Sequence, residues 1–193
     1  GMAPLAVRPV LGPSRYGVVD LDGRNRIRRF VEKPARKKAP SNLINAGVYV
    51  LSPGIFDYIS SGRRVSIERE VFPALARDGR LFGHRFEGQW IDVGEPSDFL
   101  KGNRLLLDSE FPNGYVAESS SIDERAHITS PSAVGKHVKV GAESRIGPHV
   151  SLSEEVVIGE NVRIGNSVVF PGTIISDFAS IEGAIIGEKA IIG

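Results

Sequence analysis

An aliphatic residue recurs at every sixth position through the second half of the chain. The series runs unbroken through Ile122, Ile128, Val134, Val140, Ile146, Leu152, Ile158 and Ile164. A small or β-branched residue stands four places after each member: Ala126, Ser132, Val138, Ser144, Val150, Val156, Val162 and Val168. A six-residue period kept over eight successive repeats is typical of a parallel β-helix. It determines the architecture of roughly the last 75 residues.

Each six-residue repeat predicts one short strand and one turn, and three repeats complete one coil of a triangular prism. The aliphatic side chains point inward and stack between coils, because a single coil cannot bury its apolar side alone. Small residues fit near the corners. Glycine follows the aliphatic residue at five places, where we expect it to supply the positive φ of the turn: Gly135, Gly141, Gly147, Gly159 and Gly165.

The six-residue period slips after Ile164. The next aliphatic residues follow at steps of five, six, six, five and six: Val169, Ile175, Ile181, Ile186 and Ile192. We interpret the two short steps as shortened corners. The chain stops at Gly193 within the pattern, and an uncapped β-helix exposes an edge and an apolar end. We therefore expect either a second chain that covers this end or a longer parent protein.

Composition excludes several classes of protein. The 193 residues carry a formal net charge of +1, which is not the footprint of a nucleic-acid-binding protein. The chain has no cysteine, so disulfides and cysteine-ligated zinc are excluded. No apolar run approaches the ~18 residues that span a membrane. Pro4, Arg8 and Pro9 interrupt any signal peptide, so the expected location is cytoplasmic.

Residues 1–110 predict a mixed α/β region, distinct from the β-helix of residues 111–193. A β-hairpin is expected over residues 16–32 and a second apolar strand over residues 44–51. Helices are expected over residues 53–59, 67–77 and 96–107, the second capped by Ser66 and kinked at Pro73. Short strands are expected over residues 81–86 and 89–93. This region is therefore a domain of its own.

Four short segments of the α/β region carry a family resemblance. They are Tyr16-Gly17-Val18-Val19, Phe30-Val31-Glu32-Lys33-Pro34, Ile44-Asn45-Ala46-Gly47-Val48-Tyr49 and Trp90-Ile91-Asp92-Val93-Gly94-Glu95-Pro96. In order and spacing they resemble the second half of the catalytic domain of sugar-1-phosphate nucleotidylyltransferases. That family includes glucose-1-phosphate thymidylyl- and adenylyltransferases and mannose-1-phosphate guanylyltransferases. Many members carry a C-terminal left-handed β-helix, and the expected handedness here rests on that resemblance.

The resemblance implies a role for individual residues. The backbone N–H of Gly17 would approach the sugar, Glu32 would accept hydrogen bonds from sugar hydroxyls, and Lys33 would meet the sugar phosphate. Asn45 and Gly47 would line the sugar pocket. Asp92 would ligate a Mg²⁺ that bridges the two phosphate groups, since this hard cation takes one or two carboxylates together with phosphates. The sugar phosphate would attack the α-phosphorus of a nucleoside triphosphate and release pyrophosphate.

The same residues also have purely structural interpretations. Glu32 and Lys33 could be a solvated strand end before a proline. Asn45 could be a hydrogen-bonding strand residue, and Gly47 a bulge. Asp92 could cap the turn that follows it. These alternatives predict no ligand at any of the five positions.

The family's triphosphate-binding segment has no counterpart in this sequence. That segment is a strand followed by a glycine-rich loop whose backbone N–H groups wrap the triphosphate. Residues 11–15 do not match it, and the activating arginine and lysine and the first Mg²⁺-binding aspartate are absent as well. We therefore expect no catalytic residue here. We interpret the chain as a truncated or split member of the family, inactive by itself.

Two further functions remain open. The chain could be a non-catalytic regulatory or scaffold subunit of the same fold. It could instead be a hexapeptide-repeat acyltransferase with a histidine as general base; the candidates are His127, His137 and His149, which we expect to face solvent. The expected partners are a sugar 1-phosphate and either identical subunits or a chain that supplies the missing half. Nucleic acid and membrane are not expected partners.

Overall fold

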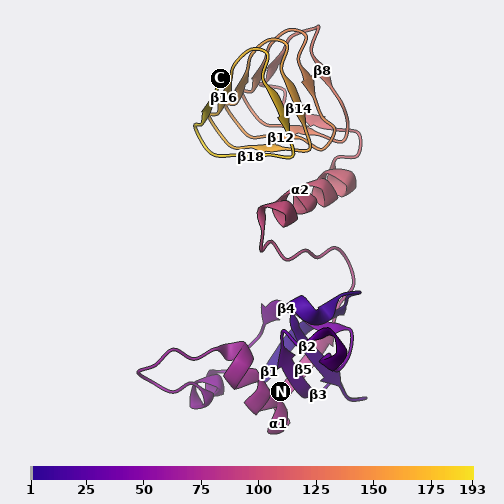
Figure 1. Cartoon of the computed structure of the whole chain (residues 1–193), viewed down its shortest axis with the longest axis vertical. Coiled ribbons are helices and arrows are strands. Elements are labelled where there is room, and N and C mark those ends of the chain that lie inside the picture. The colour runs from indigo at the N-terminus through magenta and orange to yellow at the C-terminus, as the bar shows by residue number, and fades with distance from the viewer. Residues whose placement is uncertain (1) are drawn as a thin grey trace. The chain divides into compact units, whose positions relative to one another are not determined.

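The chain forms two compact units in the computed structural model, which describes residues 2–193 (Figure 1). We call residues up to Gly88 the α/β unit and residues from Gln89 the β-helix unit. Each has its own hydrophobic core. The sequence predicted a boundary after residue 110. The compact units divide at Gly88, before the long helix, because that helix packs on the β-helix.

A mixed five-stranded sheet forms the centre of the α/β unit. Its spatial order is β3-β2-β4-β1-β5. β1 runs parallel to β5, and the other neighbouring pairs are antiparallel. The strands are β1 (Ala3–Pro9), β2 (Gly17–Leu21), β3 (Ile27–Glu32), β4 (Leu43–Tyr49) and β5 (Leu81–Arg85). The expected hairpin is therefore confirmed as β2 and β3.

Short helical segments cover the core of this sheet. Ser66 caps a π-helical turn (Ile67–Val71) by accepting a hydrogen bond from the Arg69 backbone N at 3.3 Å. The turn leads into α1 (Phe72–Arg77), with Pro73 in its first turn, where the missing N–H needs no partner. Phe72 is fully buried among the strands. Single 3₁₀ turns occupy Pro13–Arg15, Arg36–Lys38 and Pro53–Tyr58.

Two strand predictions differ from the structure. β1 was not predicted, although alternate residues Ala3, Leu5 and Val7 are fully buried in the sheet. The strand expected over residues 89–93 is wrong, because this part of the described chain is neither strand nor helix. Within residues 2–193 no helix is long and apolar enough to cross a membrane.

The β-helix unit is a stack of triangular coils, each side of which is a parallel sheet (Figure 1). The sheet orders are β6-β9-β12-β15-β18, β7-β10-β13-β16-β19 and β8-β11-β14-β17. The first seven strands are β6 (Tyr115–Val116), β7 (Ser121–Ile122), β8 (His127–Ile128), β9 (Ala133–Val134), β10 (Lys139–Val140), β11 (Arg145–Ile146) and β12 (Ser151–Leu152). The remainder are β13 (Val157–Ile158), β14 (Arg163–Gly165), β15 (Val168–Val169), β16 (Ile174–Ile175), β17 (Ser180–Glu182), β18 (Ile185–Ile186) and β19 (Ile191–Ile192).

The strand register explains the slip in the period. Val134 pairs with Leu152, whereas Leu152 pairs with Val169, so the second of these two coils is shorter by a single residue. The other two sides of the prism show the same shortening between successive coils. The prediction of shortened corners is therefore confirmed. The stacked aliphatic residues of the period form the buried core, which confirms the predicted parallel β-helix.

Glycine has a different role in the coils from the one predicted. Among the five glycines that follow an aliphatic residue, only Gly147 has a positive φ. At full-length corners the left-handed residue stands two places later, as in Glu143 and Asn161. A Cβ on Gly141 would lie 2.6 Å from the carbonyl oxygen of Gly159 in the next coil. Glycine is required here because the coils stack closely.

Helix α2 (Pro96–Glu110) lies against the β-helix. Asn103 accepts a hydrogen bond from the Ser151 hydroxyl at 2.6 Å, and its amide donates to the His149 carbonyl at 3.4 Å. His149 Nε2 lies 2.8 Å from Asp108 Oδ1, and only 17% of the His149 side chain is exposed. The prediction that this histidine faces solvent is wrong, whereas His127 and His137 are exposed as expected.

Candidate functional site

The hairpin of β2 and β3 places a partly buried carboxylate beside a glycine. Glu32 ends β3 and pairs with Gly17 at the start of β2. A Cβ on Gly17 would lie 3.0 Å from Glu32 Oε2 and 2.6 Å from Phe30 Cζ. The sequence interpretation gave Gly17 a role toward a sugar. The structure supplies a nearer reason for the glycine, since the side chains of Phe30 and Glu32 cover its Cα.

One oxygen of Glu32 has no partner. Oε2 is shielded from solvent and makes no hydrogen bond to any residue of the described chain. Buried polar atoms are nearly always hydrogen-bonded, and an unpaired one in a native fold calls for an explanation such as a ligand. A carboxylate only accepts hydrogen bonds, so a matching ligand group would be a donor such as a hydroxyl.

The next residue has an unusual backbone conformation. Lys33 has a φ of +45°, and its backbone N donates to the Tyr16 carbonyl at 3.1 Å. Left-handed conformations are uncommon for residues other than glycine, asparagine and aspartate, and they concentrate at functional sites. Lys33 is exposed and contributes a positive charge near Glu32. The strand end therefore presents an acceptor and a cation in succession.

A chain of hydrogen bonds leads from β4 to the π-helical turn. Asn45 is buried; its amide donates to Tyr49 Oη at 2.8 Å and its carbonyl oxygen accepts from the Gly47 backbone N at 3.1 Å. The Tyr49 hydroxyl in turn donates to Glu68 Oε1 at 3.3 Å. Gly47 has a φ of +79°, which favours glycine, and a Cβ there would meet no atom within 4 Å.

The charges of this cluster affect one another. Burial raises the pKa of Glu32, and the Glu68 carboxylate raises it further, while Lys33 and Arg69 oppose the shift. Burial likewise raises the pKa of the Tyr49 hydroxyl, and its hydrogen bond from Asn45 lowers it. Such perturbed groups cluster at functional sites. We call Glu32, Asn45, Tyr49 and Glu68 the polar cluster.

The predicted metal ligand lies in the other unit. Asp92 belongs to the segment at the start of the β-helix unit and is exposed. No described residue forms a hydrogen bond or ion pair with its carboxylate. Residues 2–193 contain no group of three or more histidine and acidic side chains that could enclose a metal ion. A single accessible carboxylate still fits a Mg²⁺ that takes its other ligands from phosphates and water.

The structure brings together most of the predicted site residues. Gly17 and Glu32 are directly paired, and Asn45 is connected to the same cluster through Tyr49. Sequence reasoning missed Tyr49 and Glu68. Tyr49 stood within one of the quoted segments, but nothing in the sequence placed Glu68 beside it, because their contact depends on the packing of the π-helical turn.

Comparison with known proteins addresses the family of the chain. The sequence model described as nucleotidyl transferase matches residues 1–109. The chain belongs to the nucleotidyl transferase family. A second model, described as the GMPPB C-terminal domain, matches residues 128–193. These matches confirm a nucleotide-sugar transferase-like α/β region followed by a β-helix, and they agree with the family resemblance drawn from the four segments.

Several relatives of this nucleotidyl transferase family member have known names. "Probable mannose-1-phosphate guanylyltransferase 1" of Oryza sativa subsp. japonica is 46% identical over 110 residues, covering 56% of this chain and 30% of the relative. "Mannose-1-phosphate guanylyltransferase catalytic subunit beta" of Xenopus tropicalis is 45% identical over 106 residues, covering 54% of this chain and 29% of the relative. The chain thus spans about 30% of the length of the curated relatives it matches.

Among solved structures, a Bacillus anthracis protein described as a glucose-1-phosphate thymidylyltransferase is 24% identical. Its TM-score is 0.48, and the match covers 56% of this chain and 45% of that chain.

Proposed function

We propose that the α/β unit binds a sugar 1-phosphate, of the mannose type, as the acceptor of a nucleotidyl transfer reaction. The observation that carries the proposal is the Glu32 carboxylate, whose buried Oε2 has no hydrogen-bond partner in the described chain. Sugar hydroxyls are donors that satisfy such an oxygen, and hydrogen bonds to a carboxylate are among the stronger ones. The names of the curated relatives favour mannose 1-phosphate over other sugars.

The neighbouring residues fit the two ends of this ligand. Lys33 stands next to Glu32 and supplies an exposed ammonium group for the phosphate. Asn45 uses its carbonyl oxygen and one N–H internally, which leaves its second N–H for a sugar oxygen. The bare backbone of Gly17 leaves room for Glu32 and its ligand. Binding would thus fix the sugar through Glu32 and Asn45 and orient the phosphate toward the reacting phosphorus.

In the proposed reaction a phosphate oxygen of the sugar 1-phosphate attacks the α-phosphorus of a nucleoside triphosphate. The new bond joins that oxygen to the α-phosphorus, and the bond to the leaving pyrophosphate breaks. Holding the two reactants in line supplies much of the rate of such a step. We include Asp92 as the residue that would hold Mg²⁺, which neutralises phosphate charge when bound.

Calorimetric titration tests the proposal directly. Mannose 1-phosphate and glucose 1-phosphate are titrated into the native chain with and without Mg²⁺. We expect saturable binding of mannose 1-phosphate, weakened at least about tenfold in Glu32→Gln by the loss of charged hydrogen bonds. Asp92→Asn should remove any dependence on Mg²⁺. Glu87→Gln, which removes an exposed carboxylate elsewhere in the α/β unit, is the matched control.

Two outcomes would overturn the proposal. One is equal binding by the native chain and Glu32→Gln. The other is no binding of either sugar phosphate by protein whose folding is verified by circular dichroism. The second result would favour a regulatory or scaffold subunit, in which the polar cluster is only a structural element of the α/β unit.

A further inference from the structure

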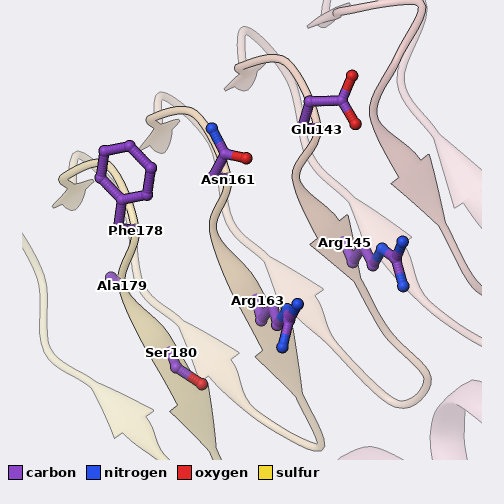
Figure 2. A pocket seen from close by; sticks show the side chains of 7 residues that line it. All are labelled: Glu143, Arg145, Asn161, Arg163, Phe178, Ala179 and Ser180. Carbon is purple, nitrogen blue, oxygen red and sulfur yellow. The ribbon is translucent and has the colours of Figure 1, made fainter.

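One side of the β-helix carries two arginines in direct register. Arg145 on β11 pairs with Arg163 on β14, and Arg163 pairs with Ser180 on β17. Adjacent strands lie about 4.8 Å apart, so both guanidinium groups project from neighbouring rungs of one sheet. Figure 2 shows them over adjacent strands on the same side of the sheet. Like charges placed opposite one another across a sheet are unfavourable unless something neutralises them.

The described chain supplies no such neutralisation. Within residues 2–193, no carboxylate lies within salt-bridge distance of either guanidinium. Glu143 lines the same pocket but forms no ion pair there. Other charged side chains of this unit do pair: Arg125 with Asp123 at 3.3 Å, and Lys101 with Asp98 at 2.9 Å. The two stacked arginines therefore offer ten N–H donors to an external anion.

An exposed aromatic ring stands at the edge of this pocket. Phe178 is 76% exposed and has a φ of +66°. A bulky residue in the left-handed region is a genuine outlier. Glu143 and Asn161 occupy the same corner position in the two preceding coils, so polar residues serve this turn elsewhere. The turn alone does not explain a phenylalanine, and burial does not explain it either.

The pocket joins the aromatic ring to the arginines. It is open, measures about 340 Å³, and is lined by Phe178, Arg145, Arg163, Asn161 and Ser180 among others (Figure 2). Guanidinium groups bind phosphate oxygens bidentately. An exposed aromatic face stacks on a nucleobase with little preference for which base. We propose that this pocket binds a purine nucleoside diphosphate, with its phosphates on Arg145 and Arg163 and its base on Phe178.

This site lies wholly within the β-helix unit and does not rest on the proposed function of the α/β unit. A nucleotide bound here would be held by the outer surface of the coils. Its phosphates would bridge two rungs, and the base would cover a third. The Asn161 amide and Ser180 hydroxyl would supply further neutral hydrogen bonds along the same path.

The test compares ADP, GDP and inorganic pyrophosphate by calorimetric titration. We expect both nucleotides to bind, with pyrophosphate at least about fivefold weaker because it lacks a base to stack. Arg145→Gln and Arg163→Gln should each weaken all three ligands about tenfold. Phe178→Asn should weaken the nucleotides toward the level of pyrophosphate and leave pyrophosphate binding unchanged.

The variants are matched to the fold. Asparagine already adopts the left-handed corner conformation at Asn161 and Asn166, so Phe178→Asn removes the ring and keeps the backbone. Lys139→Gln removes one positive charge from a different side of the β-helix and should leave the affinities unchanged. Nucleotide binding that is insensitive to both arginine variants would overturn the proposal. So would equal affinities for pyrophosphate and the nucleotides, or no binding of any of the three.

Discussion

Glu32 combines several properties that are individually unfavourable. Its carboxylate is partly buried, it faces the charge of Glu68, and one of its oxygens lacks a hydrogen bond within the described chain. It also directly precedes a residue with a left-handed backbone. Each feature costs free energy of folding, and each is explained if the residue is kept for a ligand. Function and stability therefore oppose one another at this position.

This opposition predicts a pH-dependent gain in stability for Glu32→Gln. Because the pKa of Glu32 is raised in the folded state, folding of the native chain is opposed once pH exceeds the ordinary glutamate value of 4.5. The cost grows as pH rises toward the folded-state pKa and is complete above it. At pH 7 we expect the variant to be more stable by about 0.5–1 kcal/mol in urea unfolding, a modest gain because solvent partly screens the carboxylate.

The same comparison at low pH is the internal control. At about pH 3.5 the carboxylate is largely protonated in both folded and unfolded chains, so its charge no longer distinguishes the two proteins. The difference in unfolding free energy should then shrink toward zero. A variant that is less stable than the native chain at pH 7 would contradict a strained carboxylate at this position.

The sequence located individual residues of the site better than their contacts. Gly17, Glu32, Asn45 and Gly47 stand in short segments that could be recognised without a structure. Glu68 could not be found this way, since it lies far along the chain in a π-helical turn. Its place beside Tyr49 follows only from how that turn packs on the sheet. Short segments preserve local chemistry, whereas a cluster assembled from distant elements depends on topology.

At the scale of elements, stacking distance decides which residues the coils accept. The glycine after each inward aliphatic residue is needed where another coil lies directly above it. Gly141 illustrates this, since a Cβ there would press on the carbonyl of Gly159. Gly187 holds the equivalent position in the last coil, and a Cβ there would meet no atom within 4 Å.

Gly141→Ala and Gly187→Ala therefore form a matched pair. We expect Gly141→Ala to lower the unfolding free energy of the β-helix by about 1–3 kcal/mol, because the backbone of the next coil must shift. Gly187→Ala should stay within about 0.5 kcal/mol of the native chain. Chemical denaturation followed by circular dichroism measures both. Equal effects of the two substitutions would show that coil stacking is not the cause.

Elements with a strong period were predictable, and those without one were not. The six-residue repeat predicted the β-helix because stacking demands the same residue type at every rung. β1 escaped prediction because Pro4, Arg8 and Pro9 hide a clear alternation of Ala3, Leu5 and Val7. The apolar stretch at residues 89–93 was mistaken for a strand, since short apolar runs do not distinguish strand from loop.

At the scale of the whole molecule, the two units have separate cores. The buried cluster around Phe72 and the stacked aliphatic core of the β-helix share no residue in the described part of the chain. Phe72 is fully buried, with its ring centroid 5.3 Å from that of Phe30 and 5.0 Å from that of Tyr49. Separate cores favour separate unfolding reactions.

Differential scanning calorimetry should therefore resolve two transitions. Phe72→Ala should destabilise the α/β unit by about 3–5 kcal/mol and lower only its transition. Gly141→Ala should lower only the other transition. A single cooperative transition that both substitutions shift together would show that the two units unfold as one.

The shortening of the later coils by a single residue has a consequence for how such a chain can vary. The residue is lost at a corner, yet the inward residues of every later strand still point inward. In an ordinary strand the same loss would turn each following side chain to the opposite face. Single-codon deletions should therefore accumulate at the corners of related β-helices, while their lengths otherwise differ by whole coils.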